Sequence, residues 1–161
     1  KVAEGVTFVA TANIGAEYTA TRVIDRAILD RFQIVEVDTL DQEQEVGLLS
    51  IKFPDVAPAH ITAVAEIADH TRKMVKSDDP KISTIISTRQ TVEMTSLIYD
   101  GFGLDEAAEV CVFPFYSDAG GVDSERTYMK QLVQKFMKTT DEENPWDSPT
   151  DGVDADFATT A

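Results

Sequence analysis

Apolar residues form two short runs near the start of the chain, with a segment of helical spacing between them. The first run covers residues 6–12 and the second covers residues 33–37, and both have the length of a strand. A near-continuous apolar run is typical of a strand that is buried on both faces of a mostly parallel sheet. Between the runs, four apolar residues share one face of a short helix: Val23, Ile24, Ala27 and Ile28. The pattern predicts strand, loop, helix and strand, which is an α/β arrangement.

Beyond residue 40 the apolar residues recur at helical spacing, and the ends of the helices are marked. Asp41 followed three residues later by Gln44 predicts a capped helix start, and Pro54 ends this helix. Pro58 suits the first turn of a second helix, which ends in the loop that contains Pro80. The apolar residues of this second helix are Ile61, Val64, Ala65, Ala68 and Val75.

Three further helices are predicted from Ser87 onwards. Ser87 with Gln90 has the spacing of a capping box and opens a helix that runs to about Tyr99. Residues 104–113 form a short apolar helix, and Ser124 caps a longer one. The longer helix carries an apolar stripe, of the kind that more often packs into a core than into a partner's groove: Met129, Leu132, Val133, Phe136 and Met137.

The last part of the chain, residues 139–161, is rich in acidic residues and proline and contains no basic residue. Such a segment cannot bury enough apolar surface to offset the entropy lost on ordering, so we expect a disordered tail. Trp146 and Phe157 are its isolated aromatic residues. They would suit docking on a partner, with a solvated and solubilising end of the chain as the alternative.

Composition narrows the class of protein further. The chain has 161 residues with 14 Lys+Arg against 29 Asp+Glu, a formal net charge of -15. This charge argues against nucleic acid or an anionic membrane surface as the main partner. Cys111 is the single cysteine, which excludes an internal disulfide and predicts a buried, inert thiol. There is no signal peptide and no apolar run of about 18 residues, so we expect a cytoplasmic protein.

Three polar residues are candidates for chemistry because of where they stand. Asn13 follows directly after the first apolar run, where ligands bind in open α/β sheets. Arg31 stands at the end of the short helix, where a solvated arginine that complements the helix dipole is the alternative. Arg89 lies in a first helical turn, where a cation opposes the dipole, so local stability does not explain it. The alternative is that Arg89 is an exposed arginine without a functional role.

We predict no metal site from the residue spacing. His60 and His70 are ten residues apart, which is not a metal-binding spacing. The acidic residues of the loop over residues 116–123 lack the register of a calcium-binding loop.

The order of motifs in the first 40 residues resembles AAA+ ATPases of the MoxR type. The resemblance rests on Ala-Thr-Ala-Asn13, on a loop with glycine and threonine, and on Ala27-Ile-Leu-Asp30-Arg31-Phe32 followed at once by an apolar run. It is strongest for the branch that holds the small ATPase subunit of cobaltochelatase and related phage ATPases. The implied fold is the C-terminal part of an AAA+ P-loop-type core over residues 1–40, followed by an all-α lid over residues 41–138.

The resemblance also implies roles for individual residues. Asn13 would be sensor 1, which positions the attacking water, and Arg31 would be the arginine finger offered to a neighbouring subunit. Arg26 would be at most its assistant, and Arg89 would be sensor 2, which contacts the nucleotide phosphates. ATP and Mg²⁺ are the implied cofactors. The implied partners are further copies of the chain in a ring, usually a hexamer, and a protein with an integrin-like metal-binding domain.

The phosphate-binding loop of such an ATPase has no counterpart in the sequence. No G-x-x-x-x-G-K-[ST] motif occurs, and a Walker B strand is mimicked only by residues 34–39, with Thr39 in place of the second acid. The chain begins at Lys1 without methionine, so we expect a piece of a longer protein that hydrolyses ATP only when an upstream half completes it. The alternative is a non-catalytic helical adaptor derived from an AAA+ lid.

Overall fold

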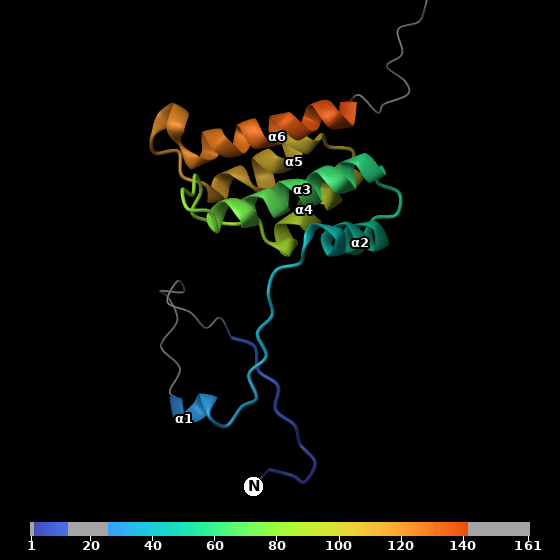
Figure 1. The fold of residues 1–161 in the computed structure, drawn as a ribbon. Coiled ribbons are helices and arrows are strands. Elements are labelled where there is room, and N and C mark those ends of the chain that lie inside the picture. The colour runs from blue at the N-terminus through green and yellow to red at the C-terminus, as the bar shows by residue number, and fades with distance from the viewer. Residues whose placement is uncertain (1, 13–25, 142–161) are drawn as a thin grey trace, which may run out of the picture. The chain divides into compact units, whose positions relative to one another are not determined.

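The computed structural model describes residues 2–12 and 26–141, and the chain divides into two compact units, Lys1–Asp38 and Thr39–Ala161 (Figure 1). Within its described residues, the first unit contains the short helix α1 (Arg26–Leu29). The second unit is helical and contains α2 (Gln42–Lys52), α3 (Pro58–Val75), α4 (Thr88–Tyr99), α5 (Leu104–Cys111), the 3-10 turns η1 (Phe113–Phe115) and η2 (Gly121–Asp123), and α6 (Glu125–Asp141).

The prediction of an α/β fold is wrong, because the described residues contain helices and no strand. Residues 6–12 and 33–37, the two predicted strands, have no regular secondary structure. Their side chains are exposed, with Val9 at 89% and Val37 at 91% relative accessibility. An apolar composition suits a strand, but a strand forms only when neighbouring strands satisfy its backbone, and fewer than three strands are marginal in water.

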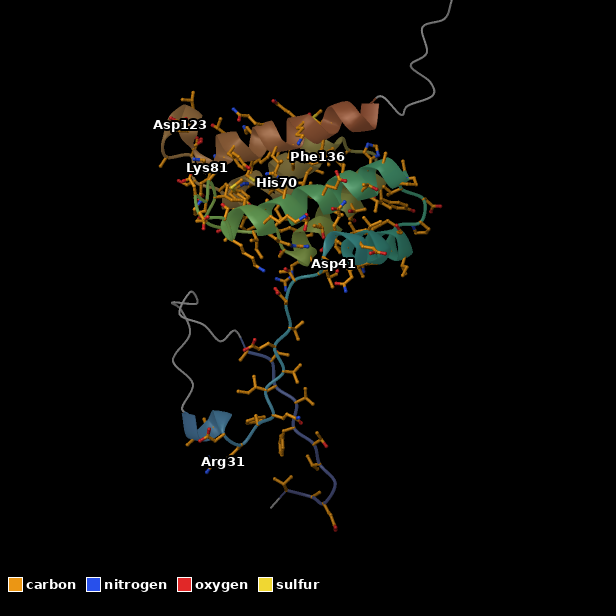
Figure 2. All side chains as sticks on the ribbon, viewed as in Figure 1. Arg31, Asp41, His70, Lys81, Asp123 and Phe136 are labelled. Carbon is orange, nitrogen blue, oxygen red and sulfur yellow. The ribbon has the colours of Figure 1, made fainter. Side chains whose placement is uncertain are left out.

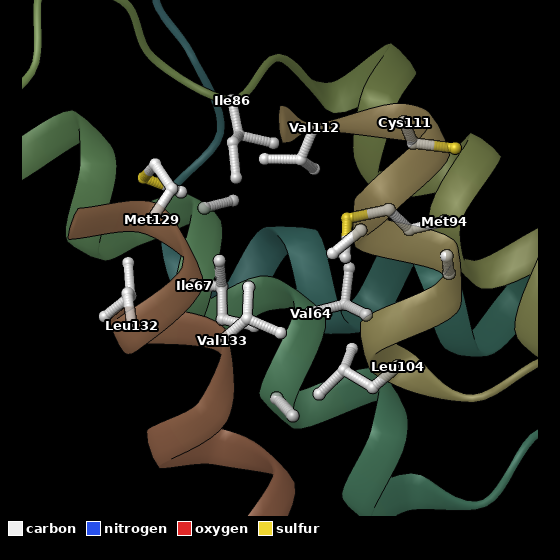
Figure 3. Close-up of a cluster of buried hydrophobic side chains, with 14 of the residues drawn as sticks. Val64, Ile67, Ile86, Met94, Leu104, Cys111, Val112, Met129, Leu132 and Val133 are labelled. Carbon is white, nitrogen blue, oxygen red and sulfur yellow. The ribbon is translucent and has the colours of Figure 1, made fainter. Parts of the chain in front are cut away.

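The helical unit is built around α3, which packs against α2, α4 and α6, while α5 packs against α4 and α6. Buried side chains from all these helices meet in one core, part of which Figure 3 shows. The predicted stripe on α6 is confirmed as core: Met129, Leu132 and Val133 are buried, and Phe136 and Met137 pack at its edge. Cys111 is buried beside Val112, and burial raises the pKa of its thiol, as expected for an inert cysteine.

The predicted helix starts are also confirmed, because they depend on contacts between close neighbours in sequence. At α2, the Gln44 backbone N–H donates to Asp41 Oδ1 over 2.8 Å, and Asp41 N–H donates back to Gln44 Oε1 over 3.3 Å. Ser87 and Gln90 form the same reciprocal pair at α4. Pro58 occupies the first position of α3, as its fixed φ favours.

Helix α6 begins after Ser124, whose hydroxyl accepts from Thr127 N–H over 3.1 Å, so the predicted cap is present. The helix continues to Asp141, into the segment whose composition predicted the start of the tail. Among the helices of the described residues, none combines the length and the apolar character needed to cross a membrane.

Candidate functional site at the start of helix α4

Arg89 is the second residue of α4, and its side chain is exposed. Within the described residues, no group accepts a hydrogen bond or forms an ion pair with its guanidinium, and the first turn of α4 contains no acidic residue. The amino-terminal end of a helix has positive partial charge, so this arginine adds a positive charge to an end of the helix that is already electropositive. An anion such as a phosphate is the ligand that would be favoured by both the guanidinium and the helix end.

Beneath this exposed turn lies a buried ion pair between α2 and α3. Glu45 is 0% and Arg72 is 5% exposed, and Arg72 Nη1 lies 2.8 Å from Glu45 Oε2. Two hydroxyls from the start of α4 also donate hydrogen bonds to the Glu45 carboxylate. Thr91 Oγ1 donates to Oε1 over 2.5 Å, and Thr88 Oγ1 donates to Oε2 over 3.3 Å. The residue before Arg89 and the residue two after it therefore both bind Glu45.

The guanidinium of Arg72 also donates hydrogen bonds to two backbone carbonyl oxygens. Nη1 donates to the carbonyl oxygen of Leu40 over 2.7 Å, and Nη2 donates to that of Ile86 over 3.2 Å. The hydroxyl of Thr71 accepts from the Ile86 N–H over 3.0 Å, so two consecutive residues of α3 fix both polar groups of Ile86. Ile86 directly precedes Ser87, the residue that caps α4. The start of α4 is thus fixed from α2 and from α3.

Arg31 lies in the other unit, two residues beyond the end of α1, with an exposed side chain (Figure 2). Its N–H donates to the Ile28 carbonyl oxygen over 3.0 Å, and its guanidinium donates to that of Ala27. These contacts fit an arginine that complements a helix end, the alternative given above, and the catalytic role stays a prediction. Arg26 is the first residue of α1, and its side chain lies outside what the structure describes. Asn13 lies outside the described residues altogether.

The two histidines have different surroundings. His70 Nε2 lies 2.8 Å from the hydroxyl of Tyr128, across the contact between α3 and α6. His60 lines a surface hollow together with Tyr99 and Phe102. In the parts of the chain that the structure describes, no three His, Cys, Asp or Glu residues are grouped as a metal ion would require.

The sequence patterns did not reveal Glu45 or Arg72 as important residues. A signal for them was present, since each charge occupies the apolar face of its helix: Glu45 lies four residues before Leu49, and Arg72 four residues after Ala68. A charge in such a position is buried, and buried charges require a partner. Which partner it has depends on how the helices pack, because the two residues are 27 positions apart.

Comparison with known proteins places this helical unit in a family. Residues 45–138 match the family described as CbbQ/NirQ/NorQ C-terminal. The chain is 33% identical over 107 residues to "Putative chaperone BssE" of Thauera aromatica, which covers 66% of this chain and 35% of that protein. The chain thus spans about a third of the length of this curated relative. No solved structure matches the chain significantly.

These matches confirm the MoxR-type resemblance at the level of the helical unit. The family match covers all of α3, α4 and α5, and it includes Arg89 and the buried pair beneath it. The chain therefore belongs to the CbbQ/NirQ/NorQ C-terminal family, which is the lid region of MoxR-type AAA+ ATPases.

Proposed function

We propose that the chain is the lid-bearing part of a ring-forming AAA+ ATPase that uses ATP hydrolysis to remodel a partner protein. The observation that supports this most strongly is Arg89, an exposed arginine without a partner among the described residues, in the first turn of α4. An arginine here does not stabilise its own helix, whereas it is well placed to bind the phosphates of a nucleotide.

The residues present fit ATP better than they fit Mg²⁺. Arg89 and the electropositive end of α4 suit a polyphosphate. Within the described residues no cluster of carboxylates could hold the metal ion, so its ligands would come from elsewhere in the complete protein. When bound, ATP supplies the phosphoanhydride that is hydrolysed, and Mg²⁺ neutralises charge on its phosphates.

Each of the three segments of the chain has its own role in this proposal. Residues 1–40 contribute Asn13, which orients the attacking water, and Arg31, which reaches the nucleotide of the neighbouring subunit, with Arg26 at most its assistant. Residues 41–138 are the lid, and residues 139–161 are an acidic tail. The ring is a hexamer, and the remodelled partner is a protein with an integrin-like metal-binding domain. The net charge of -15 supports a protein partner in preference to nucleic acid.

A non-catalytic helical adaptor is the second candidate. It is favoured by the helical unit's own buried core. The two candidates are separated by the natural coding sequence: a Walker A motif and an Asp-Glu Walker B upstream of Lys1 favour the ATPase, and a start codon close to Lys1 favours the adaptor.

The test of the ATPase role measures ATP affinity in the complete protein with Arg89→Ala. A charge-assisted hydrogen bond contributes about 1.5–3 kcal/mol, so the dissociation constant of ATP should rise about 10- to 100-fold. Lys52→Ala is the matched control, because it removes an exposed cation from the same unit at the last residue of α2. An unchanged affinity with Arg89→Ala would contradict the proposed phosphate contact.

A further inference from the structure

Glu45 and Arg72 are the only charged side chains that are buried in the part of the chain that the structure describes. Burying an ion pair removes both charges from water, and replacement by apolar side chains of similar size is often neutral or stabilising. The pair is also incompletely satisfied, because the buried Nε of Arg72 has no hydrogen-bond partner. Stability alone therefore does not explain why two charges occupy the centre of a helical core.

The contacts of the pair join two places that are far apart in sequence. One is Leu40, the second residue of the helical unit, where the chain enters it. The other is the segment that leads into α4, held through Ile86, Thr88 and Thr91. The guanidinium of Arg72 thus binds the backbone where the chain enters the unit and the backbone three residues before Arg89. The carboxylate of Glu45 binds the two threonines on either side of Arg89.

We propose that Glu45 and Arg72 are positioning residues that hold Arg89 in a fixed place relative to Leu40, so that its guanidinium reaches the nucleotide phosphates. This inference rests on the proposed function and deepens it. A binding site tolerates displacements of only about 0.5 Å, and within the described residues the Arg89 guanidinium has no hydrogen bond or ion pair that would fix it. The buried pair instead fixes the backbone on which Arg89 stands, through its hydrogen bonds with Ile86, Thr88 and Thr91. Neither residue touches the nucleotide, so they act through Arg89.

The test is a double-mutant cycle on ATP affinity in the complete protein, with a fluorescent, non-hydrolysed ATP analogue as the probe. Glu45→Leu combined with Arg72→Met replaces the pair by apolar side chains. Thr91 keeps an acceptor in this variant, because its hydroxyl also lies 2.9 Å from the Thr88 carbonyl oxygen. With Arg89 present, the paired replacement should weaken analogue binding about tenfold, the order of coupling within one network. In the Arg89→Ala background it should have an effect below about twofold.

The two outcomes that overturn the inference differ from failure of the proposed function. If Arg89→Ala weakens binding but the paired replacement does not, the pair is structural only. If the paired replacement weakens binding equally in both backgrounds, it does not act through Arg89. If Arg89→Ala itself has no effect on binding, the proposed phosphate contact of Arg89, and with it the proposed function, is contradicted.

Thermal unfolding of each variant separates positioning from folding. The paired replacement should unfold only moderately below the temperature of the unmodified protein, because exchange of a buried ion pair for apolar groups is often neutral, while the Leu40 and Ile86 carbonyl oxygens each lose a donor. If it unfolds early, Thr88→Val is measured in the same cycle, because it removes one hydroxyl contact with Glu45 from the surface turn. A loss of about fivefold that disappears with Arg89→Ala supports the inference, and an equal loss in both backgrounds overturns it.

Discussion

The two units of the chain differ in whether their apolar side chains are buried. In Thr39–Ala161, apolar side chains from five helices and their connections meet in one buried core. In Lys1–Asp38, the described large apolar side chains are mostly exposed: Val2, Val6, Phe8, Val9, Ile28, Phe32, Ile34, Val35 and Val37. The sequence patterns predicted buried apolar residues in both units, but among the described residues this prediction holds only in the second unit.

The difference teaches which kind of element can form with few neighbours. A helix satisfies its own backbone hydrogen bonds and needs only a surface for its apolar face. A strand leaves its backbone groups unpaired until another strand lies beside it. Exposed apolar surface of this extent is typical of a region that contacts further protein.

The largest expected effect concerns catalysis in the complete protein and separates the roles of the two units. Arg31→Ala should lower the hydrolysis rate about 10³- to 10⁵-fold, roughly 4–7 kcal/mol, with ATP binding retained, whereas Arg89→Ala should act on binding. Arg31→Lys should not restore the rate, because an ammonium cannot reproduce the planar fork of a guanidinium. Steady-state hydrolysis and analogue binding measure the two effects separately.

A mixing experiment shows whether Arg31 acts on the neighbouring subunit. Subunits with Arg31→Ala are combined with subunits disabled in the phosphate-binding loop of the complete protein, and each kind is inactive alone. Partial recovery of hydrolysis in mixed rings is the expected result. Lack of recovery at any ratio, with mixing demonstrated, would count against a role in trans and leave Arg31 as a helix-capping arginine.

The next effect concerns stability and sharpens the contrast in burial. Leu49 is 0% exposed, so Leu49→Ala should lower the free energy of unfolding by about 2–5 kcal/mol through lost packing and a cavity. Val9 is 89% exposed, so Val9→Ala should change it by less than about 0.5 kcal/mol. Denaturant unfolding of the two variants, followed by helical circular dichroism, tests this. Equal losses would show that residues 2–12 pack in solution.

The smallest effect is a pH dependence within the helical unit. Burial acts to raise the pKa of Glu125, but hydrogen bonds from Ser83 and Ser117 outweigh it, and the pKa is lower than its ordinary value. The carboxylate therefore contributes stability above its unfolded pKa, near 4.5, and this contribution is lost as the pH falls through the lower folded value. After solvent screening it amounts to at most about 1 kcal/mol.

Glu125→Gln isolates this contribution. The variant should show a weaker loss of stability between about pH 5 and pH 3 than the unmodified chain, measured as the midpoint of denaturant unfolding at each pH. Asp118→Asn is a suitable control, because this carboxylate in the same region is mostly exposed and its ion pair with Arg126 spans 3.8 Å. Parallel acid profiles for the unmodified chain and Glu125→Gln would contradict the assignment.

Helix starts in the second unit could be predicted because each depends on residues within one turn. Asp41 with Gln44 and Ser87 with Gln90 form their capping contacts within a single turn, and Pro58 suits the first position of its helix through its own φ. The same holds for Arg89, whose place in a first turn follows from the cap at Ser87. The AAA+ lid itself was inferred from a resemblance carried by motifs in the first 40 residues, and the family match supports it for residues 45–138.

Tertiary structure decided everything that depends on distant partners. It left residues 6–12 and 33–37 without the neighbouring strands that their composition suits. It also brought Glu45 and Arg72 together beneath Arg89, with Arg72 bound in addition to the Leu40 carbonyl oxygen. Sequence determines which side chains must be buried or capped, because those requirements act within a helical turn. Which groups meet across the core is decided by how whole helices pack, and the support beneath the candidate site arises there.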